Sequence, residues 1–172
     1  MSILLAGRAP THYRTRQTPI GEITIAADPT AITHLEFHLP ESVAASCIPK
    51  ETPLIRQAFA ELEEYFQQKR QVFDLPLAPT GTPFQRLVWE ALLTIPYGET
   101  RSYQEIAAAT GNPKACRAVG MANNRNPISI IIPCHHVIGK NGSLVGYGGG
   151  LDIKRRLLEL ESGGHRSAPA PR

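Results

Sequence analysis

The first half of the chain contains two short segments in which apolar and polar residues alternate. Residues 21–27 and 31–37 both have the period-two pattern of strands with one buried face. The Asp-Pro-Thr sequence at 28–30 is typical of a tight turn, so we expect an antiparallel pair. Residues 1–16 are basic and mixed and should lead in loosely, and residues 40–50 should form a loop.

A helical period replaces this alternation after Thr52. Pro53 suits the first helical position, and apolar residues then recur on one face, at Leu54, Ala58, Leu62, Tyr65 and Phe66. Residues 71–75 can return as a short edge strand, and 77–81 have the composition of a linker. The pattern predicts a small α+β domain over residues 1–78, which has a supporting role and contains no catalytic constellation.

The pattern over residues 79–161 predicts a second, mainly helical domain. Ser102 and Glu105 form a capping box ahead of one helix, and another helix runs from Pro113 to about residue 124. Two short helices joined by a tight turn are typical of a helix-turn-helix that binds DNA, although such pairs also occur without that function. Thr82 and Pro83 start an earlier helix, whose apolar face consists of Phe84, Leu87, Val88, Ala91 and Leu92.

A hairpin turn at 140–143 and a glycine-rich segment at 145–150 precede the final helix. The glycines would let backbone N–H groups approach a flat ligand, and a mobile loop is the alternative. An anion at a helix C-terminus is unfavourable, so Glu161 is either functional or placed there by chance. Residues 162–172 should be disordered. Asp152 should cap the final helix, whose inward residues are Ile153, Leu157, Leu158 and Leu160.

The chain of 172 residues has a formal charge of only +3, but this charge is unevenly distributed. Between Glu105 and Asp152 there is no acidic residue. Such a stretch suits a surface that faces phosphates, and a solvated basic face without a partner is the alternative. The interval contains these basic residues and histidines: Lys114, Arg117, Arg125, His135, His136 and Lys140.

The cysteines suggest a reducing environment. The chain has 3 cysteines at irregular spacing, which form neither a disulfide framework nor a zinc motif. No apolar run is long enough for a signal sequence or a membrane span. We therefore expect no metal, no membrane contact and a cytoplasmic location.

Residues 130–139 carry the strongest chemical signal. The isoleucines at 130–132 predict a buried strand, and Pro133 ends it because proline has no N–H to donate. Cys134 follows, beside His135 and His136, and a thiol near imidazole can be a nucleophile. Neighbours in a strand point to opposite faces, so contact between Cys134 and His135 needs a bridging water or a turn. A buried structural cysteine is the alternative.

With these motifs, the region from Thr82 to Glu161 resembles the C-terminal domain of the O6-alkylguanine-DNA alkyltransferases, which repair alkylated guanine and are consumed by the reaction. The N-terminal half matches only in size and coarse pattern. The resemblance implies the α/β (α+β) class, with a ribonuclease-H-like N-terminal domain and a winged helix-turn-helix C-terminal domain. It rests on motifs that match in order and spacing: Ser102-Tyr103, Arg117-Ala118-Val119-Gly120, Asn126-Pro127, Pro133-Cys134-His135, and Gly146-Tyr147-Gly148-Gly149-Gly150 ahead of Lys154 and Glu161.

For the chemistry, the resemblance implies transfer of the alkyl group from O6 of guanine, and from O4 of thymine, to the thiol of Cys134. A Cys–water–His–Glu network would activate this thiol through His135 and Glu161, and Asn126 would support the turn that presents it. Tyr103 would donate to N3 of the leaving guanine. The transfer would be stoichiometric and irreversible, because a thioether is not hydrolysed under mild conditions, and no cofactor is implied.

For binding, the resemblance implies double-stranded DNA, contacted in the minor groove, with the damaged base flipped out of the duplex. Arg117 would fill the space that the base leaves, and the other DNA contacts would come from Lys114, Ala118, Gly120 and Arg125. The flipped base would lie in a pocket formed by Tyr103, Val137, Tyr147, Gly148, Gly149 and Lys154. The protein is expected to be a monomer, and cooperative binding along DNA is left open.

Two positions depart from the family's usual pattern. His136 follows the Cys-His pair where the family has arginine, an expected ion-pair partner, so local stability or thiol reactivity can differ. Cys116 stands beside Arg117 where many relatives have alanine, and we interpret it as a small apolar substitute.

Two other classes of function remain as alternatives. A non-catalytic lesion binder of the alkyltransferase-like type would lack the reactive cysteine, whereas Cys134 is present here. A papain-like hydrolase that used Cys134 and His135 would turn over repeatedly, but no local signature of that class is present.

Overall fold

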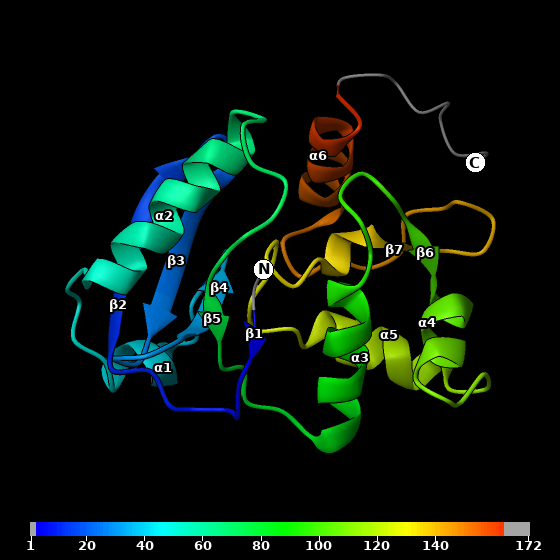
Figure 1. Cartoon of the computed structure of the whole chain (residues 1–172), viewed down its shortest axis with the longest axis horizontal. Coiled ribbons are helices and arrows are strands. Elements are labelled where there is room, and N and C mark those ends of the chain that lie inside the picture. Colours follow the sequence, from blue (N-terminus) through cyan, green and yellow to red (C-terminus); the bar gives the residue numbers. More distant parts are fainter. Residues whose placement is uncertain (1–2, 164–172) are drawn as a thin grey trace. The chain divides into compact units, whose positions relative to one another are not determined.

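The computed structural model describes residues 3–163, and this part of the chain divides into two compact units. The first unit runs to Thr80 and includes Pro127–Ile131, and the second consists of Gly81–Asn126 and the chain from Ile132 onward. Strands dominate the first unit and helices the second (Figure 1). Within residues 3–163, no helix is both long and apolar enough to cross a membrane.

The first unit is built on a mixed sheet, whose strands among the described residues are β1 (Ile3–Leu4), β2 (His12–Thr18), β3 (Gly21–Ala27), β4 (Ile32–Glu36) and β5 (Pro76–Leu77). Strands β2, β3 and β4 form an antiparallel meander in which Ile25 pairs with Leu35, which confirms the predicted pair. Strands β5 and β1 extend the sheet in parallel beyond β4.

Three predictions for this unit are wrong. Residues 1–16 contain β1 and most of β2, which is an edge strand with largely exposed residues and therefore lacks buried apolar positions. The expected edge strand at 71–75 is replaced by β5, which begins at Pro76 and lies between β4 and β1 and not at the edge of the sheet; proline is tolerated as the first residue of a strand. The expected loop at 40–50 contains a short helix, α1 (Glu41–Ala45).

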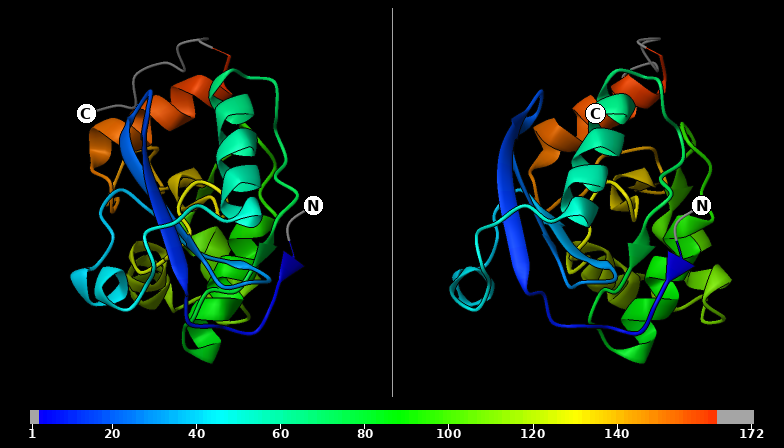
Figure 2. Two further views of the ribbon diagram at one scale, coloured as in Figure 1. Left: turned by 90° about the vertical axis from the view of Figure 1, so that its left-hand side faces the viewer. Right: turned by 60° about the vertical axis from the view of Figure 1, so that its left-hand side comes forward.

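Helix α2 (Pro53–Phe66) covers one face of this sheet and contacts β2 and β3 (Figures 1 and 2). Thr52 caps it, since its Oγ1 accepts from the Ile55 N–H (N···O 3.3 Å). Leu54 and Phe66 are less buried than predicted, because the stripe that faces the sheet is centred one residue further along the helix. The buried apolar residues of α2 are Ile55, Ala58, Phe59, Leu62 and Tyr65.

The second unit consists mainly of helices. Among the described residues it contains α3 (Pro83–Leu93), α4 (Tyr103–Ala109), α5 (Cys116–Asn124), α6 (Leu151–Glu161) and the 3₁₀ helix η1 (Cys134–His136). A short parallel pair joins β6 (Arg101–Ser102) to β7 (Val137–Ile138).

The starts of α3 and α4 agree with the sequence, whereas those of α5 and α6 do not. Thr82 and Ser102 both form capping boxes. Helix α5 begins three residues later than predicted, because the Asn112 side chain accepts from the Lys114 N–H and forms a turn of its own. Gly150 (φ 94°), and not Asp152, is the N-cap of α6.

The predicted strand at 130–132 is wrong, although its residues are buried as expected. Ile128 makes a single bridge to Leu35, and the chain then turns, with the Ile131 N–H bonded to the Ser129 carbonyl (N···O 2.9 Å). Ile130 has φ 71°, which a branched side chain rarely adopts. The run of isoleucines therefore indicated correctly that these residues are buried, but not that their backbone is extended.

The turn after β7 and the end of α6 differ in part from the predictions. The turn at 140–143 exists, with the Gly139 N–H bonded to the Ser143 carbonyl at 2.8 Å, but it closes no hairpin because β7 pairs in parallel with β6. Ser162 caps the C-terminus of α6. The predicted disordered tail lies, for residues 164–172, outside the described residues.

Helix α3 is fixed to α5 through Trp89, which is 1% exposed. Its Nε1 donates to the Ala122 carbonyl at 2.9 Å. The ring also explains Gly81, where an added Cβ would lie 2.4 Å from the indole. Leu87, predicted to face inward, is 48% exposed, because Val88 and Trp89 occupy the buried side of the helix.

Trp89→Phe should lower the free energy of unfolding by about 1–3 kcal/mol, because a buried hydrogen bond and part of a buried ring are lost. Chemical denaturation followed by circular dichroism measures this. Leu87→Ala on the same helix is the matched control and should change stability by at most about 0.5 kcal/mol. Equal losses in both variants would contradict the role of Trp89.

Candidate active site

Cys134 lies in a turn and not at the end of a strand. It begins η1, and its N–H donates to the Ile132 carbonyl at 2.8 Å. The same carbonyl accepts from Asn126 Nδ2 at 2.7 Å, and the Cys134 carbonyl accepts from Asn123 Nδ2 at 3.3 Å. Both asparagines are buried. Helix α5 and the residues after it therefore hold the backbone that presents the thiol.

The carboxylate of Glu161 joins both histidines of the motif. Nε2 of His135 lies 2.8 Å from Oε1, and Nε2 of His136 is hydrogen-bonded to Oε2. The Gly98 backbone N–H also donates to Oε2, at 3.2 Å. Glu161 is the last residue of α6, and these donors offset the unfavourable position of an anion at a helix C-terminus.

Burial and hydrogen bonding determine the protonation states of Glu161 and His135. Burial alone would raise the pKa of Glu161, but the hydrogen bonds from His135 and His136 outweigh it and hold the pKa well below its usual range. Burial lowers the pKa of His135 and outweighs the opposing hydrogen bond to Glu161. At neutral pH an ionised carboxylate therefore faces a neutral imidazole.

The ionised carboxylate fixes the tautomer of His135. Because Oε1 can only accept, Nε2 of His135 must carry the proton, which leaves Nδ1 with a lone pair. This Nδ1 is buried and has no hydrogen-bond partner among the described residues. It is therefore available to accept a proton.

Lys154 on α6 ties down the chain on the other side of the motif. Its Nζ donates to the carbonyls of Val137 (2.6 Å), Val145 (3.0 Å) and Gly146 (3.3 Å), and the side chain is 0% exposed. Burial lowers the pKa of Lys154 to about 8, and a negative charge on Cys134 acts in the opposite direction. The ammonium is thus mostly charged at pH 7, and it favours the thiolate form of Cys134.

Tyr103, the first residue of α4, is held against the glycine-rich segment. Its hydroxyl donates to the Val145 carbonyl at 2.8 Å. Burial raises the pKa of Tyr103, and the charge of Cys134 raises it further, so the phenol keeps its proton. At Gly148 nothing lies within 4 Å of the position that a Cβ would take, so the packing of the protein itself does not require glycine there.

The exposed side of α5 is basic and lined with small residues. Gly120 faces the ring of Tyr103, where an added Cβ would lie 3.8 Å from Cε1. This surface can contact phosphates close to the helix that carries Tyr103. Its exposed residues are Lys114 ahead of the helix and Arg117, Ala118, Met121 and Asn124 on it, with Arg125 at its C-terminus.

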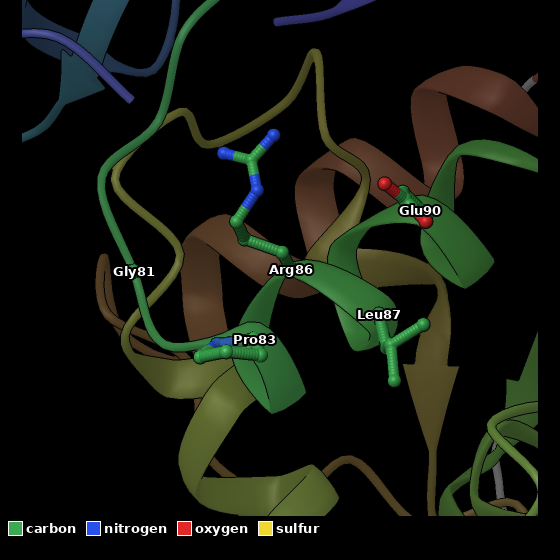
Figure 3. Close-up of a pocket in the computed structure, with 5 residues that line it drawn as sticks. All are labelled: Gly81, Pro83, Arg86, Leu87 and Glu90. Carbon is green, nitrogen blue, oxygen red and sulfur yellow. The ribbon is translucent and has the colours of Figure 1, made fainter. Parts of the chain in front are cut away.

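A surface hollow of about 450 Å³ lies elsewhere, at the start of α3 (Figure 3). It is lined by Gly81, Pro83, Arg86, Leu87 and Glu90. None of these lining residues has a thiol or hydroxyl group that could act as a nucleophile, and no residue of the Cys134 motif contributes. Cys134 therefore remains the candidate nucleophile of the second unit.

His135, His136 and Glu161 also have the composition of a metal site, since their ligand atoms lie within 4.8 Å of one another. However, Nε2 of each histidine is already bonded to a carboxylate oxygen. A metal ion held through these Nε2 atoms would have to displace both hydrogen bonds inside a buried cluster. The arrangement fits a hydrogen-bonded network better than a metal centre.

The structure connects His135 with Glu161 and Lys154 with Val137, and it places Asn126 behind the turn of Cys134. Arg125 and Lys114 remain on the exposed surface of α5 and its turn. Sequence reasoning missed the bond from Asn123 and the second bond of Glu161. Asn123 lies three residues before Asn126, and such spacing puts both on one side of a helical turn, which is the signal that was available.

A buried thiol beside a neutral, proton-accepting imidazole, with an exposed basic helix in the same unit, is suited to nucleophilic attack on a ligand that carries phosphates. The protein-family model of the 6-O-methylguanine DNA methyltransferase DNA-binding domain matches residues 83–163. The model of the ribonuclease-like domain of the same family matches residues 11–79.

Individual relatives agree with these family matches. A methylated-DNA–protein-cysteine methyltransferase of Methanosarcina barkeri is 52% identical over 153 residues, which cover 87% of this chain and 96% of that protein. The constitutive one of Bacillus subtilis is 49% identical and covers 87% and 94%. A crystal structure of Mycobacterium tuberculosis OGT in complex with DNA superposes with a TM-score of 0.83, at 50% identity, and covers 89% of this chain and 94% of that one.

Acidification should destabilise the fold through His135 and Glu161. The pKa of His135 lies below its ordinary 6.5 in the folded chain, so lowering the pH through 6.5 protonates the unfolded chain first. The pKa of Glu161 lies below its ordinary 4.5, so its stabilisation is present above pH 4.5 and disappears as the pH falls further. Glu161→Gln should be less stable at pH 7 and should lose less stability below pH 4.5.

Denaturation midpoints between pH 8 and pH 3 measure this dependence. Glu90→Gln, at an exposed position of α3, is the matched control and should follow the unmodified protein. A Glu161→Gln variant whose loss on acidification parallels that control would contradict the prediction.

Proposed function

The chain belongs to the 6-O-methylguanine DNA methyltransferase family, and from that premise we propose that it repairs O6-alkylguanine in DNA by moving the alkyl group to its own Cys134. It is a methylated-DNA–protein-cysteine methyltransferase that acts once per chain. The observation that carries the proposal is the buried Cys134 beside a neutral His135, which Glu161 orients.

The transfer forms one bond and breaks one bond. The thiolate of Cys134 attacks the sp³ carbon of the alkyl group, the S–C bond forms, and the bond from that carbon to O6 breaks. The thiol proton passes to Nδ1 of His135, directly or through water, and the leaving guanine gains a proton in its place. Glu161 stabilises the imidazolium that forms, and Lys154 favours the thiolate. The product is a thioether, so the chain is not regenerated.

Entry of the base requires a change at Tyr103. Its hydroxyl is bonded to the Val145 carbonyl, so it must leave this acceptor before it can donate to N3 of guanine. The carbonyls of Cys134 and Val137 already accept from Asn123 and Lys154, but each has a second lone pair for the exocyclic amine. The remaining wall of the pocket consists of Tyr147, Gly148 and Gly149.

DNA is the partner of this reaction, and α5 is the element proposed to bind it. The helix enters the minor groove, where small residues at Ala118 and Gly120 permit close approach to the sugar-phosphate chain. Arg117 fills the stack after the base is flipped, and Lys114 and Arg125 contact phosphates. The absence of acidic residues between Glu105 and Asp152 supports this orientation.

The proposal extends to the organisation of the whole protein. Residues 1–78 form a supporting domain and residues 79–161 the domain that binds DNA and reacts. The protein acts as a monomer on double-stranded DNA, also accepts O4-alkylthymine, and needs no cofactor. Because the reaction consumes a thiol, the proposed location is the reducing cytoplasm.

Intact-mass analysis with excess duplex carrying one O6-methylguanine tests the function. The protein should gain one methyl group, located by peptide mapping on Cys134, and then stop. Cys134→Ala should gain none and should still bind the duplex. Cys116→Ala is the matched control and should react like the unmodified protein. Methylation of the Cys134→Ala variant, or repeated turnover, would overturn the assignment.

Arg117→Ala should slow transfer from duplex O6-methylguanine at least about tenfold, because flipping the base costs a few kcal/mol, which insertion of the Arg117 side chain offsets. Its reaction with free O6-benzylguanine should change less than about threefold, since no flipping is required. Single-turnover rates measure both reactions. Arg14→Ala, which removes one exposed positive charge on β2, is the control. Equal losses on the two substrates would contradict the proposal that Arg117 fills the space left by the flipped base.

A further inference from the structure

His136 is the residue of η1 to which the proposed reaction assigns no role. It is 3% exposed, and its Nε2 is hydrogen-bonded to Oε2 of Glu161. The other oxygen, Oε1, lies 2.8 Å from Nε2 of His135. The two imidazole rings meet edge to face, with centroids 4.3 Å apart. One buried carboxylate is thus shared by two adjacent histidines.

A carboxylate is planar, so fixing one oxygen fixes the direction of the other. The His136 side chain holds Oε2 and thereby defines where Oε1 lies relative to His135. The Gly98 N–H also reaches Oε2, but at 3.2 Å and from backbone that carries no charge. The bond from His136 therefore constrains Oε2 through a side chain, in addition to the backbone bond from Gly98.

We propose that His136 is a positioning residue for the thiol-activating network: its Nε2 donor holds Oε2 of Glu161 so that Oε1 orients His135 toward Cys134. This inference rests on the proposed alkyl transfer. It assigns to His136 a role that needs a donor at the position of Nε2 and that does not need an imidazole ring.

The charges around this network define its response to pH. The groups that face it are Lys154 from α6, Tyr97 after α3, and Cys134 and His135 from η1. His136 lowers the pKa of His135, whereas Glu161 raises it. This effect of His136 is one of charge, and both neutral amides remove it equally. A donor on Oε2 also withdraws negative charge from Oε1, so its loss should strengthen the bond from Oε1 to a protonated His135 and raise the pKa of His135 further.

Substitution of His136 by each of two amide side chains, glutamine and asparagine, distinguishes the effect of the hydrogen-bond donor from that of side-chain volume. The Nε2 of glutamine takes nearly the same place as Nε2 of histidine, whereas the amide of asparagine reaches only as far as Nδ1. His136→Asn should slow transfer to Cys134 about ten- to a hundredfold, since a buried hydrogen bond to a charged group is lost. His136→Gln should recover most of this loss. The two variants differ by one methylene, so their folding should be similar.

The measurement is the single-turnover rate of alkyl transfer from free O6-benzylguanine between pH 5.5 and 9, read by intact mass. The acid limb reports the essential base. In His136→Asn this limb should move to higher pH, and in His136→Gln it should move less. His38→Asn and His38→Gln, at an exposed position, are the matched controls and should retain the rate and the profile.

The outcomes are distinguishable. Equal rates in His136→Asn and His136→Gln, or a lower rate with an unchanged pH profile in both, would overturn the positioning role and leave a packing role. If either variant fails to fold, as judged by its thermal transition, the pH profile of the other against the unmodified protein decides in the same way. An unmodified protein that gains no alkyl group would instead overturn the proposed function itself.

Discussion

The carboxylate of Glu161 is buried at the C-terminal end of α6, where the helix dipole disfavours negative charge. It is retained as an anion because His135, His136 and the Gly98 N–H all donate to it. Removing any of these donors would leave buried charge less well compensated, which is costly. The tautomer of His135, and with it the lone pair on Nδ1 that we propose as the base for Cys134, depends on this one group.

Helix α6 supplies two opposite charges to the motif from one side. Lys154 and Glu161 are seven residues apart, which is close to two helical turns, so both point toward η1 and β7. Glu161 is hydrogen-bonded to His135, and Lys154 binds the Val137 carbonyl and the glycine-rich segment. The position of α6 therefore fixes both the His135 ring and the backbone on the other side of Cys134.

The backbone before Cys134 is strained and buried at the same time. Ile130 at φ 71° costs about 1–3 kcal/mol, which burial of the isoleucines and the bond from Asn126 can offset. The result is a fixed turn in place of a strand end. A strand would have sent the side chains of Cys134 and His135 to opposite faces, whereas successive side chains in a 3₁₀ turn are only about 120° apart.

Local physical chemistry is visible in the sequence, and it determined much of this protein. Proline and hydroxyl caps predicted the starts of α2, α3 and α4, and alternation predicted β3 and β4. The edge strand β2 was not predicted, because an exposed strand does not need apolar residues at every second position. The isoleucine run was misjudged because apolarity reports burial, while the choice between strand and turn depends on which neighbours supply hydrogen bonds.

The Pro-Cys-His motif and the unusual position of Glu161 predicted candidate reactive groups from the sequence alone, because thiol, imidazole and carboxylate side chains have a recognisable chemistry. The contact of His136 with Glu161 and that of Asn123 with Cys134 join residues 25 and 11 positions apart in the chain. Local spacing can place Asn123 on the same side as Asn126, but it does not encode which distant atom either side chain reaches. Only the packing of α6 and α5 against η1 decided them, because side chains meet where helices are placed and not where they lie in the sequence.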